Sequence, residues 1–236
     1  MGPFIEAMEQ CPKSGLHNPY KNPARYLLFG KVMLRAAELL HKPEVFNFFS
    51  RLIQRVIPKS KGQADGELLI TRNFVENFTG DNVRFLARSF GYPGDHTGQS
   101  TTGYRWPFGP VACISPFNYP IEIPFLQFMG ALFMGNKVLL KVDSRVSICM
   151  EQVIRMLISC GLPKEDVCLI HSDGPNMEYL LKSAPIRMTQ FTGSSGVAER
   201  LAVELKGKIK IEDAGYDWKI TGPDVRDTDF VAFTCD

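Results

Sequence analysis

The sequence lacks a long uninterrupted hydrophobic run. Its longest apolar stretch, residues 121–134, is broken by a glutamate, a proline, a glutamine and a glycine, whereas a helix that crosses a bilayer needs about 20 consecutive apolar residues. The apolar core of a secretory signal is also missing, and two glutamates occur among the first nine positions. We therefore expect no membrane segment and no targeting segment within this chain.

An excess of one charge is lacking too, because 27 Lys and Arg residues face 25 Asp and Glu residues and the net charge is only +2. The two signs are interspersed, which argues against a nucleic-acid partner. The six cysteines form no C-x-x-C pair and the four histidines are far apart, so we expect reduced thiols and no metal site. With 236 residues, 44% of them hydrophobic, the chain can form one sizeable core or two modest ones.

Helical patterns occupy the first part of the chain, residues 1–90. Its first 21 residues contain several prolines and glycines and are expected to be irregular. Beyond them, apolar residues recur at helical spacing between proline and asparagine start signals. We expect this helical part to pack on the remainder of the chain. The first predicted helix begins at Asn22-Pro23, with the asparagine as cap. The second follows Pro43 and ends before Pro58. The third spans 65–90, with a candidate break at Gly80-Asp81.

A different texture begins at Gly91. Residues 91–104 are rich in Gly, Ser, Thr and Pro and are predicted to form a loop, and beyond them short apolar runs alternate with segments of helical periodicity. Such alternation is typical of an α/β fold with a doubly wound parallel sheet of Rossmann type, which we assign to residues 91–236. The predicted strands are 110–115, 137–142, 167–171, 188–192 and 208–212, and the predicted helices are 121–135, 146–160, 177–183 and 197–205.

The turn F-T-G-S-S-G-V-A, residues 191–198, joins one predicted strand to the next helix. Gly193 and Ser194 would place free N–H groups of the helix N-terminus against an anion such as a phosphate. Alone this signal is weak, because the turn is neither G-x-G-x-x-G nor a P-loop, and a plain helix cap is the alternative. Asn118 and Lys141 lie at other strand ends, where parallel sheets bind ligands, but an asparagine bonded to its own turn and an exposed lysine are the more ordinary readings.

Four motifs, taken in order, resemble the NAD(P)-dependent aldehyde dehydrogenase superfamily. They are G-P-V-A-C-I-S-P-F-N-Y-P-I-E-I-P, G-N-K-V-L-L-K-V-D-S, F-T-G-S-S and I-E-D-A-G, within residues 103–224. The spellings G-Y-R-W-P-F-G-P, L-L-K-V-D-S and E-D-A-G-Y-D-W-K are most similar to the plant-type mitochondrial pyrroline-5-carboxylate dehydrogenases, which oxidise glutamate γ-semialdehyde in proline breakdown. The resemblance implies NAD as cofactor, a small-molecule aldehyde as substrate, a homo-oligomeric enzyme and the mitochondrial matrix as its location.

The resemblance also implies roles for individual residues. Asn118 would donate its side-chain amide to the oxyanion that develops during aldehyde oxidation. Glu212, otherwise a solvated carboxylate at a strand end, would be the general base for the deacylating water. The cofactor-binding residues would be Lys141 for the adenosine ribose, Gly193 and Ser194 for the pyrophosphate, and Ser115, Pro116 and Phe117, the last two beside the nicotinamide.

The chain departs from the family pattern at three points. Ala198 replaces a usual glycine near the pyrophosphate turn, and Ser144 replaces a glutamate that contacts the ribose. The family's nucleophilic cysteine lies further beyond the general base than Asp236, which is only 24 residues past Glu212. Cys235, in the context F-T-C-D, lacks the usual Gly-Gln turn and is expected to be structural.

These departures lead us to expect a chain that is truncated at both ends, lacks the catalytic domain and is inactive alone. Two alternatives stay open. One is a non-catalytic module that binds NAD or caps a full-length partner subunit, which NAD binding without aldehyde-dependent NADH formation would support. The other is a structural remnant that binds no ligand and tends to aggregate, against which a monodisperse, cooperatively melting sample would argue.

Overall fold

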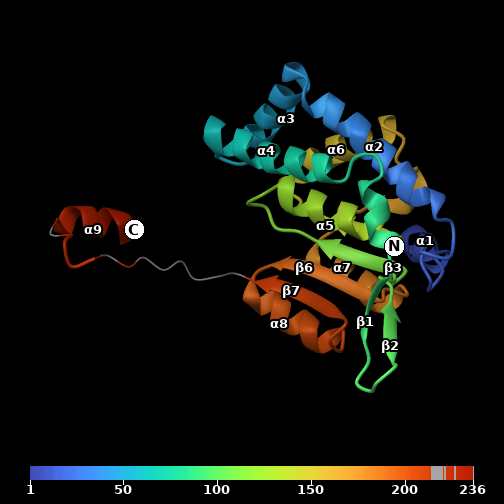
Figure 1. Ribbon diagram of the computed structural model, residues 1–236. Coiled ribbons are helices and arrows are strands. Elements are labelled where there is room, and N and C mark those ends of the chain that lie inside the picture. Colours follow the sequence, from blue (N-terminus) through green and yellow to red (C-terminus); the bar gives the residue numbers. More distant parts are fainter. Residues whose placement is uncertain (214–219, 221, 226, 236) are drawn as a thin grey trace.

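Five parallel strands form the central sheet of the computed structural model (Figure 1). Their order is β5, β4, β3, β6, β7. The chain therefore adds β4 and β5 on one side of β3, and then β6 and β7 on the other side. This reversal is the topological switch point of a doubly wound sheet, and the predicted α/β fold is confirmed. The structure describes residues 1–213, 220, 222–225 and 227–235. The strands are β3 (Pro110–Ile114), β4 (Lys137–Lys141), β5 (Val167–Leu169), β6 (Met188–Gly193) and β7 (Ile209–Asp213).

Helices cover both faces of the sheet, because the side chains of each strand alternate between them. Along β3, Val111 and Cys113 belong to one hydrophobic core, and Ala112 and Ile114 belong to the other. Helices α5 and α6 share the first core, while α7 and α8 share the second. The bounds are α5 (Glu122–Phe133), α6 (Ser147–Ser159), α7 (Gly174–Ser183) and α8 (Ser195–Glu204), with the short 3-10 helix η2 (Lys164–Asp166) before β5 and α9 (Thr228–Cys235) after β7.

Three N-terminal helices, α2, α3 and α4, extend the first core beyond α5 (Figure 1). Tyr26 and Phe29 of α2 are fully buried. The rings of Phe29 and Phe74 pack against Phe133 of α5, with centroids 6.0 and 6.1 Å away. Three helices thus occupy this part of the chain and share one hydrophobic core with α5 and α6. Their bounds are α2 (Ala24–Leu40), α3 (Pro43–Val56) and α4 (Lys61–Asn77).

The first 21 residues are not irregular throughout, so that prediction was wrong. They contain α1 (Gly2–Glu9), which has Pro3 in its first turn, where proline is tolerated because its missing N–H would have no helical partner. Met8 is fully buried in the second core, and α1 contacts α7 and β4. Packing against these elements stabilises a short helix that local composition did not predict.

The third predicted helix begins and ends earlier than expected. α4 begins at Lys61 because Ser60 and Gln63 form a reciprocal capping box. It ends at Asn77, shortly before Gly80, whose φ of 57° is a left-handed conformation typical of helix termini. The short 3-10 helix η1 (Asn82–Ala87) follows. The helix thus ends before the candidate break at Gly80-Asp81.

Two further local predictions were wrong. The expected loop at 91–104 is part of an antiparallel hairpin of β1 (Phe90–Pro93) and β2 (Ser100–Gly103), which projects from the sheet (Figure 1). The expected cap of α2 is also absent: Pro23 stands at the N-cap position, and Asn22, with a φ of 52°, donates its side-chain amide to the Leu16 carbonyl oxygen 3.2 Å away. Pairing between the two strands overrides the local signal at the hairpin, and the contact with Leu16 does so at Asn22.

His17 is a buried histidine held in its neutral form. Its side chain is fully buried, and Nε2 lies 3.0 Å from the Phe133 carbonyl oxygen. Nε of Arg25 donates to Nδ1 at 3.3 Å, and because arginine can only donate, Nδ1 must be the unprotonated nitrogen. Burial lowers the pKa of His17 from 6.5 to about 4, and the charge of Arg25 acts in the same direction.

We expect His17 to make the fold less stable in acid. Above pH 6.5 the imidazole is neutral in both the folded and the unfolded chain, but between pH 6.5 and about 4 only the unfolded chain binds the proton, so the free energy of unfolding decreases as the pH falls. Urea unfolding across the neutral-to-acid range should show a weaker pH dependence for His17→Gln, while the exposed His96→Gln should follow the wild type. The same slope in His17→Gln as in the wild type would contradict this assignment.

Candidate functional site

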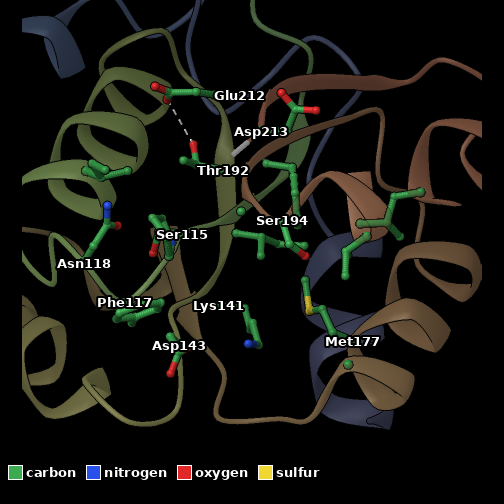
Figure 2. Close-up of a pocket in the computed structure, with 18 of the residues that line it drawn as sticks. Ser115, Phe117, Asn118, Lys141, Asp143, Met177, Thr192, Ser194, Glu212 and Asp213 are labelled. Atoms are coloured by element: carbon green, nitrogen blue, oxygen red, sulfur yellow. Dashed lines mark hydrogen bonds between the residues drawn. The ribbon is translucent and has the colours of Figure 1, made fainter. Parts of the chain in front are cut away.

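A cavity of about 730 Å³ lies at the carboxyl ends of β3, β4, β6 and β7, at the switch point of the sheet (Figure 2). This is where doubly wound sheets bind their ligands. All eight residues singled out from the sequence line this one cavity, and they come from four separate segments of the chain. They are Ser115, Pro116, Phe117, Asn118, Lys141, Gly193, Ser194 and Glu212.

The segment after β3 carries Asn118 to the cavity. The backbone N–H of Ser115 donates to the Lys141 carbonyl oxygen at 3.1 Å, which fixes the start of the segment. The Ser115 side chain is 3% exposed, and its hydroxyl has no hydrogen-bond partner in the described chain. The Asn118 side chain makes no hydrogen bond to any described residue. The alternative of an asparagine bonded to its own turn is therefore not observed. Its N–H₂ group is available to a ligand.

The turn between β6 and α8 presents backbone donors. Ser194 stands at the N-cap position, yet its side chain does not cap the helix, so N–H groups of the first turn are available to an anion. A Cβ atom at Gly193 would lie 2.7 Å from the Phe191 ring, so any larger residue there would require that ring to shift. Ala198 is buried in the second core and does not line the cavity, so the departure from the family's glycine leaves the cavity open.

Lys141 at the end of β4 has a carboxylate neighbour that the sequence predictions missed. Asp143 lines the cavity (Figure 2) and accepts two side-chain hydrogen bonds from Arg145, each 2.9 Å long. These bonds hold the pKa of Asp143 below its usual value. Arg145 also lies over the Phe117 ring, 4.3 Å from its centroid. Ser144, which replaces the family's ribose-binding glutamate, does not line the cavity. The spacing Lys-x-Asp could have indicated Asp143, since alternate residues along a strand point the same way.

Glu212 is exposed at the end of β7, as a solvated carboxylate would be, and it also has a protein neighbour. Its Oε2 atom lies 3.4 Å from the Thr192 hydroxyl, which in turn accepts a hydrogen bond of 2.8 Å from the Gln127 amide of α5. Because the amide occupies the hydroxyl as an acceptor, the hydroxyl hydrogen is directed to Glu212. Figure 2 shows the Thr192–Glu212 contact toward one end of the view, with Asn118 and Lys141 among the other side chains that line the cavity. Neither Gln127 nor Thr192 was predicted, because their link depends on the packing of α5 against β6.

A second wall of the cavity, formed by α7 and α8, was also missed. Met177 is 3% exposed and faces the cavity from α7 (Figure 2). Glu178 accepts from Lys182 at 2.9 Å and pairs with Arg200 of α8 at 3.4 Å. The hydrogen bond from Lys182 lowers the pKa of Glu178. This wall gives one side of the cavity a mixed apolar and charged character, which no local motif indicated.

Thiols and metal ligands contribute nothing to the cavity in the described residues. Cys11, Cys113, Cys149, Cys160 and Cys168 are free, and none of them lines it. Burial raises the pKa of both Cys113 and Cys149 to about 12, which makes them poor nucleophiles. The side chain of Cys235, expected to be structural, and residues 214–219, which belong to the stretch E-D-A-G-Y-D-W-K, lie outside the described residues. The described residues contain no group of His, Cys, Asp and Glu side chains that could hold a metal ion.

Comparison with known proteins confirms the resemblance to this family. The profile of the aldehyde dehydrogenase family matches residues 30–217. The mitochondrial delta-1-pyrroline-5-carboxylate dehydrogenase 12A1 of Arabidopsis thaliana is 62% identical over 234 residues, which are 99% of this chain and 42% of that protein. The chain thus spans less than half the length of this relative. No described helix is long and apolar enough to cross a bilayer.

Solved structures share the fold. Succinic semialdehyde dehydrogenase from Streptococcus pyogenes, in complex with NADP+, superposes with a TM-score of 0.77 at 13% identity over 90% of this chain and 46% of that chain. A putative methylmalonate-semialdehyde dehydrogenase from Sinorhizobium meliloti 1021, complexed with NAD, gives 0.67 at 23% identity over 82% of this chain and 38% of that chain. At these identities the likeness concerns the fold alone. The profile match and the Arabidopsis relative establish that the chain belongs to the aldehyde dehydrogenase family.

Proposed function

We propose that this chain binds NAD in the cavity at the switch point and contributes Asn118 and Glu212 to the oxidation of glutamate γ-semialdehyde to glutamate. The observation that carries the proposal is the meeting of an unbonded amide, an oriented carboxylate and a donor-rich Gly-Ser turn in one cavity. The substrate, the role in proline breakdown and a mitochondrial location are proposed because the Arabidopsis relative bears that name.

The cavity suits a dinucleotide. Gly193 and Ser194 offer backbone donors to a pyrophosphate, and Lys141 would bind the adenosine ribose. Ser115, Pro116 and Phe117 would line the nicotinamide end, where the Ser115 hydroxyl still has no partner in the described chain. NAD rather than NADP is proposed from the resemblance of the motifs alone, because Arg145 neutralises Asp143 on the cavity wall and the pair would not repel a phosphate on the ribose.

The two site residues have complementary roles. A cysteine thiolate, which the rest of a full-length family member would supply, would add to the aldehyde carbon, and bound NAD would take up the hydride that the resulting thiohemiacetal loses as it becomes an acyl thioester. Asn118 would donate a hydrogen bond to the carbonyl oxygen as negative charge develops there, a contact that is stronger in the transition state than in the ground state. Glu212, oriented by Thr192, would take a proton from the water that releases the acid product.

A second candidate is a module that binds the cofactor without turnover of its own. It is favoured by one observation, that no described cysteine lines the cavity. Turnover is therefore best measured in a chimaera in which this chain replaces the matching 234 residues of the Arabidopsis protein. In the chimaera we expect NADH formation to depend on glutamate γ-semialdehyde. A folded chimaera that binds NAD but does not oxidise this aldehyde would refute the substrate, and absence of saturable NAD binding to the chain itself would refute the cofactor.

Lys141→Met should weaken NAD binding to the chain by about 10- to 150-fold, because a hydrogen bond from a charged donor is worth about 1.5 to 3 kcal/mol. Isothermal titration calorimetry measures this change directly. Lys210→Met is the matched control, since Lys210 is exposed on β7 and does not line the cavity. An unchanged dissociation constant for Lys141→Met would remove this lysine from the proposed site.

A further inference from the structure

The helix that follows the Asn118 turn is capped by a distant part of the chain. α5 begins after Ile121, which has no side-chain cap to offer, so the first N–H groups of the helix need other acceptors. Glu67 of α4 supplies one: its Oε1 atom accepts from the backbone N–H of Ile121 at 2.8 Å and of Glu122 at 3.2 Å. A carboxylate at this end also complements the helix dipole. The N-terminal helical part thus fixes the start of α5.

The second oxygen of Glu67 is paired as well. Oε2 accepts from Nζ of Lys59 at 2.8 Å, and the two side chains are 0% and 12% exposed. A buried ion pair of this kind contributes little net stability compared with apolar residues of the same size, because desolvation offsets the attraction. Its hydrogen bonds from the Ile121 and Glu122 N–H groups do, however, define where the backbone at Ile121 must lie. The pair therefore contributes more to the position of the backbone at Ile121 than to the stability of the fold.

Lys59 also contacts the residue next to Asn118. Its Nζ atom lies 3.7 Å from the centroid of the Tyr119 ring, within the range of a cation–π interaction. Tyr119 itself lines the cavity. Together with the Ser115–Lys141 backbone bond, these contacts hold the segment that carries Asn118 from both sides.

We infer that Glu67 and Lys59 are positioning residues, which hold the Asn118 amide at the place where it meets the developing oxyanion. The inference rests on the proposed function, because it concerns the same amide. Neither residue lines the cavity, so they act only through the Asn118 segment. An error of about 1 Å in a reacting group costs on the order of 10²-fold in rate, so displacement of the Asn118 segment by loss of this pair would slow turnover.

Two substitutions of Glu67 test the inference in the chimaera. Glu67→Gln keeps the size and one acceptor oxygen but loses the charge, and it should lower kcat by about tenfold with KM for NAD within about twofold. Glu67→Ala should lower kcat further. The control is Glu76→Gln on the same helix, whose side chain is 40% exposed and pairs with His41; it should leave kcat unchanged.

A double-mutant cycle separates positioning from a general structural role. If Glu67 acts through Asn118, Glu67→Gln should change kcat by less than about twofold when Asn118 is already alanine. A structural role would lower the rate equally in both backgrounds and would overturn the inference. If Asn118→Ala itself leaves turnover unchanged, the proposed function fails instead.

Amide hydrogen exchange of the chain itself gives a readout without turnover. Exchange at Ile121 and Glu122 should accelerate by at least about tenfold in Glu67→Gln and stay unchanged in Glu76→Gln. Should Glu67→Ala fail to fold, the isosteric glutamine and this exchange measurement decide. Unchanged exchange, or a lower Tm with unchanged kcat per folded molecule, would contradict the positioning role.

Discussion

Replacing Glu212 by glutamine should slow steady-state turnover of the chimaera by about 10²- to 10⁴-fold, the usual contribution of a general base. Glutamine has the same shape and can still accept a hydrogen bond from Thr192 through its oxygen, so the cavity should keep its form. Because the proposed base acts only on the deacylating water, hydride transfer should continue. We therefore expect one rapid equivalent of NADH per site, followed by a slow phase.

Stopped-flow absorbance measures both phases of this reaction, and calorimetry checks that the affinity for NAD is unchanged. Glu199→Gln is the matched control, since Glu199 is exposed on α8 and does not line the cavity. Turnover within about twofold of the wild type in Glu212→Gln would exclude this carboxylate as the base. Loss of the burst would mean that Glu212 acts before the acyl intermediate forms.

Replacing Asn118 by alanine should slow NADH formation by about 10²- to 10³-fold, as the loss of one oxyanion donor does in other enzymes. The amide makes no hydrogen bond within the described protein, so its removal should cost little stability. The defect should lie in hydride transfer itself. Unlike Glu212→Gln, this variant should show no rapid burst.

The isosteric Asn118→Asp sharpens this test, because a carboxylate at the same place would repel the developing oxyanion and should be at least as slow as alanine. Asn73→Ala, at an exposed position of α4, should behave as the wild type. A burst of normal rate in Asn118→Ala would show that the amide does not face the reacting oxygen.

Much of the fold and of the candidate site could be predicted from the sequence, because both follow from local patterns. Short apolar strands alternating with amphipathic helices indicate a parallel sheet, and the carboxyl ends of such strands meet at one edge. Asn118, Lys141, Gly193 and Glu212 each follow or end a strand, and the structure brings them to one cavity. Their chemical roles came from the family motifs, and those roles stay predictions.

The remaining features depend on contacts between distant segments. Glu67 caps a helix that begins 54 residues later, and no local pattern on α4 marks it for that role. Gln127 reaches Thr192 only because α5 packs on the sheet. Prolines and glycines suggested loops where the structure has helix α1 and the β1–β2 hairpin. Burial of Met8 stabilises α1, and pairing of the two strands stabilises the hairpin.

The most direct test of the central claim is a crystal structure of this chain grown with NAD. We expect the pyrophosphate against the N–H groups that follow Gly193, the adenosine ribose at Lys141, and the nicotinamide near Asn118 and Glu212. An empty cavity at saturating NAD, or a dinucleotide bound at another surface, would contradict the proposed site.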